Sequence, residues 1–360
     1  MSKLDVMKTP RARRRAMIVA GACVAMLAFS GCAASSPTKP GELTKITVSV
    51  PVGVLSLGPF YVAEANGYFK EHGLDVQTTV IPTDAGALAA LLSGATDFAM
   101  VAVPSLLSAF DQGASFKVVA LMGDQSQAGC AVRSDIADEF PKADAGWEKQ
   151  AAAIAGHTLA VPSIGGGIYN AITFSMSQAG VSADQIKNLN VVAMGSADPR
   201  AFLAALQQKT VDVICGGIPV PQVAIQQGAA VDYLSPVRGD VEALNGITDE
   251  AWAVTPAGLA SDPGKSQAVF EAISEALDFI HAKPDEAAKV IKAQALPDLD
   301  QKTFDLAFAV FLDAWATSPV ITEDQWKKNG ALAEFITGKP FTVKLDDVGA
   351  TELWAKESKK

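Results

Sequence analysis

Six short loops carry the residue types with the clearest chemical potential, because they combine glycine or proline with serine or aspartate. Glycine lets the backbone approach a ligand closely, and serine adds a hydroxyl that donates or accepts a hydrogen bond. Where such a loop leads into a helix, the unpaired N–H groups of the first turn also face the loop. We expect a small solute to bind at these loops, which are residues 52–60 (VGVLSLGPF), 83–86 (TDAG), 103–105 (VPS), 163–167 (SIGGG), 195–199 (GSADP) and 216–219 (GGIP).

The same residue types also form ordinary turns and helix caps, and Asp84 and Asp198 are suited to cap the helices that follow them. Arg200 is the cation close to these loops in sequence. A strongly anionic ligand would therefore be held by N–H and hydroxyl groups. The two aspartates instead favour a ligand with N–H or O–H donors, and the sequence leaves both chemistries open.

Metal and catalytic chemistry are not indicated. His72, His157 and His281 are dispersed, and the four cysteines form no CxxC pair, so we predict no metal site, no cofactor and no catalytic residue. Cys130 and Cys215 lie 85 residues apart. Outside the cytoplasm they could form a disulfide worth about 4 kcal/mol, and the alternative is two buried free thiols.

The composition argues against an extended nucleic-acid surface. The chain has 360 residues, 49% of them hydrophobic, and its 29 Lys and Arg against 39 Asp and Glu give a net charge of −10. Nucleic-acid binding needs clustered cations that displace phosphate counterions. The length and the apolar fraction instead fit two ordinary globular domains or one large one.

The N-terminus has the features of a lipoprotein signal peptide over residues 1–31. A basic segment precedes the uncharged apolar residues 16–29, and small residues then lead to Cys32. We expect a lipid on Cys32, a flexible tether over residues 32–44 and a net charge of −15 on the mature chain. An uncleaved anchor is the alternative, and Sec and Tat export both remain open. Either anchor places the remainder outside the cytoplasm.

Alternating strand and helix patterns predict an α/β fold. Short apolar strands that alternate with helices of about ten residues indicate parallel sheets with crossover helices. The expected strands are 46–51, 74–81, 97–101, 117–121, 158–161, 190–194, 211–215 and 252–256. The expected helices are 59–66, 85–92, 104–112, 168–179, 199–208, 221–228, 267–281, 284–292, 300–314 and 323–336.

The two halves of the α/β region repeat each other. A shift of 115 residues places Leu88, Ala89, Ala90, Leu91, Asp97 and Pro104 on Leu203, Ala204, Ala205, Leu206, Asp212 and Pro219. Because these identities keep their order within one strand–loop–helix frame, we predict two doubly wound lobes of the same design. The helical C-terminal segment is expected to pack on the first lobe.

Four segments resemble the nitrate/sulfonate/taurine-type substrate-binding proteins of ABC importers. Residues 58–76 (GPFYVAEANGYFKEHGLDV) resemble the run that follows the first strand in that family. Three later segments also match family patterns: residues 91–98 (LLSGATDF), 156–162 (GHTLAVP) and 279–288 (FIHAKPDEAA). The resemblance covers about residues 45–292.

The resemblance implies a type II clamshell, in which ligand lies between two α/β lobes joined by two crossover strands. Lobe one would comprise residues 45–127 and 253–360, and lobe two residues 128–252. The crossings would lie near residues 128–133 and 252–256.

In that family the ligand contacts come from the loops described above. By position the resemblance implies ligand contacts at Ser56, Leu57, Gly58, Asp84, Pro104, Ser105, Ser163, Gly166, Gly167, Ser196, Asp198, Ile218 and Pro219. Many members carry Trp-Glu-Pro where this chain has Gly217-Ile218-Pro219. This departure opens the site there and makes the ligand of the relatives a poor guide.

The resemblance implies a monomeric, lipid-anchored binding protein outside the cytoplasm, and not an enzyme. It would deliver a small organic or oxyanionic ligand to an ABC permease and its ATPase. Sulfonates, nitrate-like anions and a neutral pyrimidine precursor are the candidate ligands. One alternative is an enzyme on the same fold, similar to those of thiamine-pyrimidine synthesis, which the dispersed histidines disfavour. The other is a ligand-sensing partner of a membrane receptor.

Overall fold

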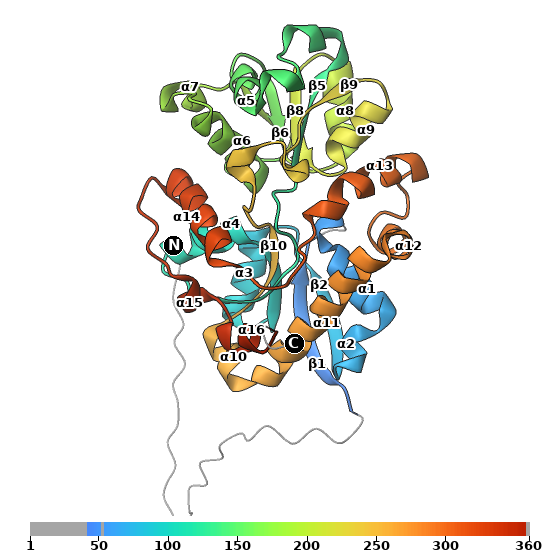
Figure 1. Cartoon of the computed structure of the whole chain (residues 1–360), viewed down its shortest axis with the longest axis vertical. Coiled ribbons are helices and arrows are strands. Elements are labelled where there is room, and N and C mark those ends of the chain that lie inside the picture. The colour runs from blue at the N-terminus through green and yellow to red at the C-terminus, as the bar shows by residue number, and fades with distance from the viewer. Residues whose placement is uncertain (1–41, 52–53, 358–360) are drawn as a thin grey trace, which may run out of the picture. The chain divides into compact units, whose positions relative to one another are not determined.

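Two five-stranded sheets organise the chain in the computed structural model, which describes residues 42–51 and 54–357 (Figure 1). The first sheet has the order β2-β1-β3-β10-β4, and the second has the order β7-β6-β8-β5-β9. Both sheets belong to one compact unit. The strands are β1 (Thr44–Val50), β2 (Leu74–Val80), β3 (Phe98–Ala102), β4 (Lys117–Leu121), β5 (Ala128–Arg133), β6 (Leu159–Val161), β7 (Val191–Ala193), β8 (Val213–Gly217), β9 (Ala230–Leu234) and β10 (Glu250–Val254).

The predicted signal peptide, Cys32 and nearly all of the predicted tether lie outside the described residues. Within the described residues, no helix is both long enough and apolar enough to cross a membrane.

The two strand orders correspond place by place, which confirms the predicted duplication. β2, β1 and β3 have β7, β6 and β8 as their counterparts. In the next place of each order lies a strand that the chain enters directly after leaving the other sheet. These two strands, β10 and β5, run antiparallel to both of their neighbours. The expectation of purely parallel sheets is therefore wrong at these positions. A strand that arrives from the other sheet starts at the edge where the parallel strands end.

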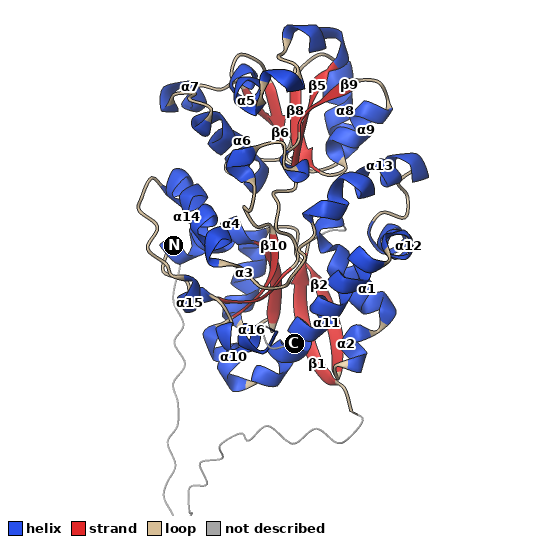
Figure 2. Ribbon diagram, viewed as in Figure 1, coloured by secondary structure: helices blue, strands red, loops and turns tan. Residues whose placement is uncertain are grey.

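Helices flank both sheets, as Figure 2 shows. The elements β9, α2, α5, α7, α10, α15 and α16 were not predicted from the sequence pattern. The helices are α1 (Gly58–Asn66), α2 (Tyr68–Glu71), α3 (Asp84–Ser93), α4 (Val103–Asp111), α5 (Trp147–Ile154), α6 (Gly167–Gln178), α7 (Ala183–Lys187), α8 (Pro199–Gln207), α9 (Val220–Gln226), α10 (Pro256–Ser261), α11 (Pro263–Ala282), α12 (Pro284–Ala295), α13 (Gln301–Phe311), α14 (Glu323–Thr337), α15 (Leu345–Val348) and α16 (Thr351–Glu357).

Local signals explain where the helices beside the first sheet begin and end. Proline lies in the first turn of α1 and of α4, where its missing N–H breaks no helical hydrogen bond. α1 ends at Gly67 and α3 ends at Gly94, both with the positive φ that glycine adopts without strain. The prolines therefore mark where α1 and α4 begin, and the glycines mark where α1 and α3 end.

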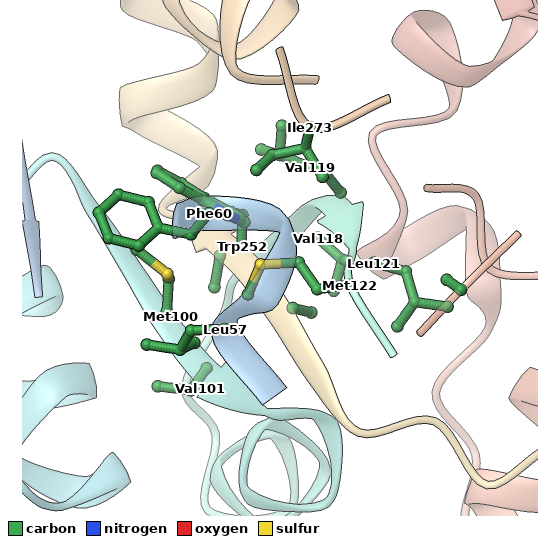
Figure 3. Packing of buried hydrophobic residues seen from close by; sticks show 14 of the residues in the cluster. Leu57, Phe60, Met100, Val101, Val118, Val119, Leu121, Met122, Trp252 and Ile273 are labelled. Carbon is green, nitrogen blue, oxygen red and sulfur yellow. The ribbon is translucent and has the colours of Figure 1, made fainter. Parts of the chain in front are cut away.

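Trp252 anchors β10 in the middle of the first sheet. Its side chain is fully buried, and its ring centroid lies 5.7 Å from that of Phe69 and 5.9 Å from that of Phe98. Figure 3 shows Phe60 and Met100 close to the same residue. Aromatic packing of this kind adds to the area buried, so it holds the returning strand firmly between β3 and β4.

The C-terminal helices pack on the helices of the first sheet, as expected, and also reach the second. α11 packs on α1 and β4, and α14 packs on α4. α14 also contacts α6, where the rings of Phe335 and Phe174 have centroids 5.5 Å apart, and α13 contacts α9. The C-terminal segment therefore contacts elements of both sheets.

Cys130 and Cys215 lie directly opposite each other on β5 and β8 and form a disulfide. Their Cα atoms are 4.1 Å apart, and both residues are fully buried. The bond closes a loop with a sequence separation of 85 residues. It therefore joins the central strands of the second sheet.

Replacing both cysteines with alanine is expected to lower the free energy of unfolding by about 3–4 kcal/mol, because the unfolded chain loses the constraint of a long closed loop. Urea unfolding of the variant and of the wild type measures the difference. Wild-type protein treated with a thiol reductant is the matched control and should show a similar loss. Peptide mapping that finds Cys130 and Cys215 alkylated without prior reduction would contradict the bond.

Candidate functional site

Three of the predicted loops lie side by side at the edge of the first sheet where its parallel strands end. Ser56 follows β1, Asp84 is the first residue of α3 after β2, and Ser105 lies in the first turn of α4 after β3. The Ser105 hydroxyl donates a hydrogen bond of 2.5 Å to Asp84 Oδ2. Since the Thr83 side chain caps α3, the Asp84 carboxylate does not serve as the cap and faces α4 instead.

Two acidic residues that the sequence analysis missed lie at the same edge. Asp249 immediately precedes β10, and Glu250 is the first residue of that strand. Glu250 pairs with Ala102 at the end of β3. The Asp249 carbonyl accepts a 2.7 Å hydrogen bond from the N–H of Val103, the first residue of α4. The side chains of both residues are buried, with 7% and 6% of their surface exposed. The signal that could have found them is a pair of adjacent acids directly before a predicted buried strand.

A residue of the second sheet completes this group. Gln127 immediately precedes β5, and its Nε2 donates a 3.3 Å hydrogen bond to Asp249 Oδ1. Gln127 and Asp249 occupy equivalent places, because each comes just before the strand that crosses into its sheet. We refer to Ser56, Asp84, Ser105, Gln127, Asp249 and Glu250 as the crossing cluster.

Two segments connect the sheets, one between β4 and β5 and the other between β9 and β10, and they run against each other beside this cluster. The Asp249 N–H donates to the Gly123 carbonyl at 2.9 Å, and the Met122 N–H donates to the Glu250 carbonyl at 2.8 Å. Gln125 and Asn245 form an isolated antiparallel bridge further along. The crossing cluster therefore lies where the backbone passes between the sheets.

Burial dominates the electrostatics of the three carboxyl groups. It raises the pKa of Asp249 to about 7 and raises the pKa values of Asp84 and Glu250 as well. The charges add to this effect, since Asp84 raises the pKa of Asp249, and both raise that of Glu250. The hydrogen bond from Gln127 opposes the shift at Asp249, and the nearby Ser56 hydroxyl opposes it at Glu250.

Ser163, Ser196 and Asp198, which the sequence predicted beside the second sheet, form no hydrogen bond or ion pair with the crossing cluster among the described residues. Ser196 accepts a hydrogen bond from the Asp198 N–H, and Asp198 caps α8 and pairs with the exposed Arg200. Asp198 therefore has the structural role that the sequence left open. Ser163 is exposed, and its hydroxyl lies where a Cβ on Gly166 would be, while Gly167 begins α6 in an exposed position.

The remaining predicted residues differ in what they can offer a ligand. Leu57 is fully buried in the core, so its side chain faces protein, and the Trp315 indole packs so closely on Gly58 that it leaves no room for a Cβ there. Ile218 is 3% exposed and belongs to the apolar cluster of the first sheet, although it follows β8 of the second. Pro104 and Pro219 are half-buried in the first turn of α4 and next to α9.

Two open surface cavities lie away from these residues. One of about 460 Å³ is lined by Trp147, Tyr233 and Arg238, among others, and one of about 160 Å³ by residues that include Asp97 and Lys265. In the described part of the chain, no group of three His, Cys, Asp or Glu side chains is arranged to hold a metal ion. The crossing cluster itself presents hydrogen-bond acceptors and acids with raised pKa values.

Comparison with known proteins identifies relatives of this chain. The family model described as NMT1/THI5 like matches residues 56–287. A Bacillus subtilis protein named as a binding protein, YtlA, is 31% identical over 99 residues. The match spans only 28% of this chain and 28% of that protein.

Several solved structures have the same fold. The alkanesulfonate-binding protein SsuA of Xanthomonas axonopodis pv. citri, bound to MOPS, has a TM-score of 0.66 and 14% identity over 86% of this chain and 99% of that one. The periplasmic nitrate-binding protein NrtA of Synechocystis has a TM-score of 0.61 and 14% identity, with 88% and 89% covered. SsuA of Escherichia coli has a TM-score of 0.63 and 17% identity, with 87% and 99% covered. The predicted resemblance is thus confirmed for the fold.

The raised pKa of Asp249 predicts a pH-dependent stability. The folded chain binds this proton more tightly than the unfolded chain does, so the contribution of Asp249 to stability is greatest below about pH 4 and is lost as the pH rises through 7. Asp249→Asn removes the titration, so we expect the variant to exceed the wild type by on the order of 4 kcal/mol at pH 8 and to match it at pH 4.

Urea unfolding at both pH values tests this expectation. Asp313→Asn, which changes an exposed aspartate, is the control and should follow the wild type. An Asp249→Asn variant whose stability advantage is the same at pH 4 and pH 8 would contradict a buried, titrating Asp249.

Proposed function

Because the chain belongs to the NMT1/THI5-like family, we propose that it is an extracytoplasmic, lipid-anchored solute-binding protein that delivers a small organic or oxyanionic ligand to an ABC permease. The observation that carries the proposal is the family match together with two equivalent sheets whose connecting segments meet at one polar cluster. The solved relatives are named as sulfonate- and nitrate-binding proteins of importers. Their fold supports solute binding and leaves the ligand of this chain to its own residues.

We assign residues 45–127 and 253–360 to one lobe and residues 128–252 to the other, except that residues 250–252 go with the first lobe because they pair with β3. Ligand would bind between the lobes, and the closed form would gain population because it alone contacts ligand from both sides. The antiparallel contact between Gln125 and Asn245 gives a short hinge beside the site. An efficient signal to the permease requires that the ligand-free protein be mostly open.

Export and lipid attachment are part of the proposal because of the N-terminal sequence. A basic segment, an apolar stretch over residues 16–29 and small residues before Cys32 match a lipoprotein signal. A lipid on Cys32, followed by a tether to residue 44, would keep a monomer at the membrane surface near its permease.

The histidines support a binding protein over the enzyme alternative. His72 contacts Glu271 and Glu275, and His281 hydrogen-bonds to the Ala316 carbonyl. His157 stacks on Phe140, with ring centroids 4.1 Å apart. Each histidine thus has a structural partner on a separate part of the chain, which leaves no shared histidine site for pyrimidine synthesis.

Cys32→Ala is expected to abolish the incorporation of labelled fatty acid into the protein, because the sulfur that would carry the lipid is removed. Immunoprecipitation from cells grown with labelled palmitate measures the label. Cys23→Ala is the matched control and should keep the label. Equal labelling of the two variants would contradict attachment through Cys32.

Solute binding is expected to stabilise the folded chain, by about 2.7 kcal/mol at a ligand concentration of 100 times Kd. Thermal unfolding of the full chain in the presence of sulfonates, nitrate, amines, pyrimidines, flavins and amino acids measures the effect. A chain that no small solute stabilises, and whose lobes keep a fixed separation in solution scattering, would contradict the proposed function.

A further inference from the structure

The crossing cluster contains several polar atoms that are buried and lack a partner. Ser56 Oγ, Asp249 Oδ2 and Glu250 Oε2 are all shielded from solvent. Asp249 Oδ2 has no hydrogen-bond partner, and Ser56, which is 3% exposed, faces Glu250 as the one group that opposes its charge loss. A buried polar group without a full set of partners is destabilising, so such atoms gathered in one place indicate a site that is completed by something else.

The charge of the cluster limits what can complete it. Within residues 42–51 and 54–357, no ion pair joins Asp84, Asp249 or Glu250 to a lysine or an arginine. The unpartnered carboxylate oxygens accept hydrogen bonds and cannot donate them when ionised. An oxyanion placed here would meet only like charge, whereas a cation with N–H donors would meet acceptors.

The position of the cluster connects this chemistry with both sheets. Asp84, Asp249 and Glu250 lie at the edge of the first sheet, and Gln127 immediately precedes β5 of the second. Gln127 Oε1 also lies 3.0 Å from the place that a Cβ on Gly217 would occupy. A molecule held by the carboxylates would therefore also lie next to the segment Gly217-Ile218-Pro219.

We propose that the ligand of this chain is a small nitrogenous cation with several N–H donors, of the amidine or guanidine type, held by Asp84, Asp249 and Glu250 with Ser56 and Gln127 beside it. This inference rests on the proposed function and names its ligand class. A planar group with two parallel N–H donors can donate both hydrogen bonds to one carboxylate. Its positive charge also offsets the repulsion among the three carboxylates. The carboxylates are covered in the structure, so the ligand reaches them when the two connecting segments separate.

Binding of such a cation is coupled to proton release. The titratable groups that face one another here are Asp84, Asp249, Glu250 and Tyr61, whose pKa burial raises to about 12. Because the pKa of Asp249 is raised to about 7, this group is mostly protonated at pH 5.5 and mostly ionised at pH 8. Affinity for a cation therefore rises with pH across this interval, by about thirtyfold for one released proton.

The test compares planar probes of opposite charge on the full chain purified in detergent. Methylguanidinium, acetamidinium and agmatine, as chlorides, are compared by calorimetry and thermal unfolding with sodium nitrate, sodium acetate and methanesulfonate at equal ionic strength. We expect the cations to bind and to raise the unfolding temperature, more strongly at pH 8 than at pH 5.5, and the anions to leave it unchanged.

Variants connect the binding to the cluster. Asp249→Asn is expected to weaken the binding of agmatine by about tenfold or more, even though it stabilises the ligand-free chain at pH 8. Asp124→Asn is the matched control, because Asp124 is a partly buried acid on the same connecting segment and faces His281 instead. It should change the affinity by less than about twofold. If Asp249→Asn does not fold, Asp84→Asn, at a half-buried position, replaces it as the variant that tests the site.

The outcomes separate this inference from the proposed function. Binding of nitrate, acetate or methanesulfonate without binding of the cations overturns the cationic ligand and leaves a solute-binding protein. Binding of the cations that Asp249→Asn and Asp84→Asn weaken no more than Asp124→Asn overturns the site. Failure of every probe overturns the inference, and only the broader solute screen then decides the proposed function.

Discussion

The burial of three carboxyl groups at one point is the constraint on which the centre of this molecule depends. Asp249 and Glu250 are buried, and Asp84 is partly buried, where the chain passes between its two sheets. Desolvation of an ionised carboxylate is strongly unfavourable unless partners compensate for it. Here the compensation within the chain is incomplete, because it comes from neutral groups, namely Ser105 and the Ala102 backbone at Asp84, Gln127 at Asp249 and Ser56 at Glu250. Proton uptake or a ligand must supply the remainder.

The duplicated topology explains why these groups meet. In both sheets the strand that arrives from the other sheet begins at the edge where the parallel strands end. That edge also receives the helix N-termini and the loops that α/β proteins use for ligands. Duplication therefore brings two such edges to one crossing, and Gln127 and Asp249 are the equivalent residues that touch there.

The relatives named as sulfonate- and nitrate-binding proteins share the fold at 14–17% identity, which leaves the chemistry of the site free to differ. Oxyanions are suited to loops that end in free N–H groups. In this chain the corresponding edge of the first sheet presents acids instead, and the cation nearest to the predicted loops, Arg200, pairs with Asp198 at the surface. The site proposed for this chain is therefore suited to a cation and not to an oxyanion.

The sequence by itself determined the alternating elements, the internal repeat and the loops at the ends of the strands, because periodicity, prolines and glycines act over a few residues. Ser56, Asp84 and Ser105 were accessible to this reasoning for that reason. The tertiary structure alone decided that β5 and β10 run antiparallel, that Asp198 is a cap while Asp84 is not, and that Asp249 and Glu250 join a site formed by residues far away in the chain. The strand directions depend on pairing between residues far apart in the chain, such as Cys130 and Cys215 with a separation of 85 residues, and the fate of each aspartate depends on which neighbours the fold brings to it.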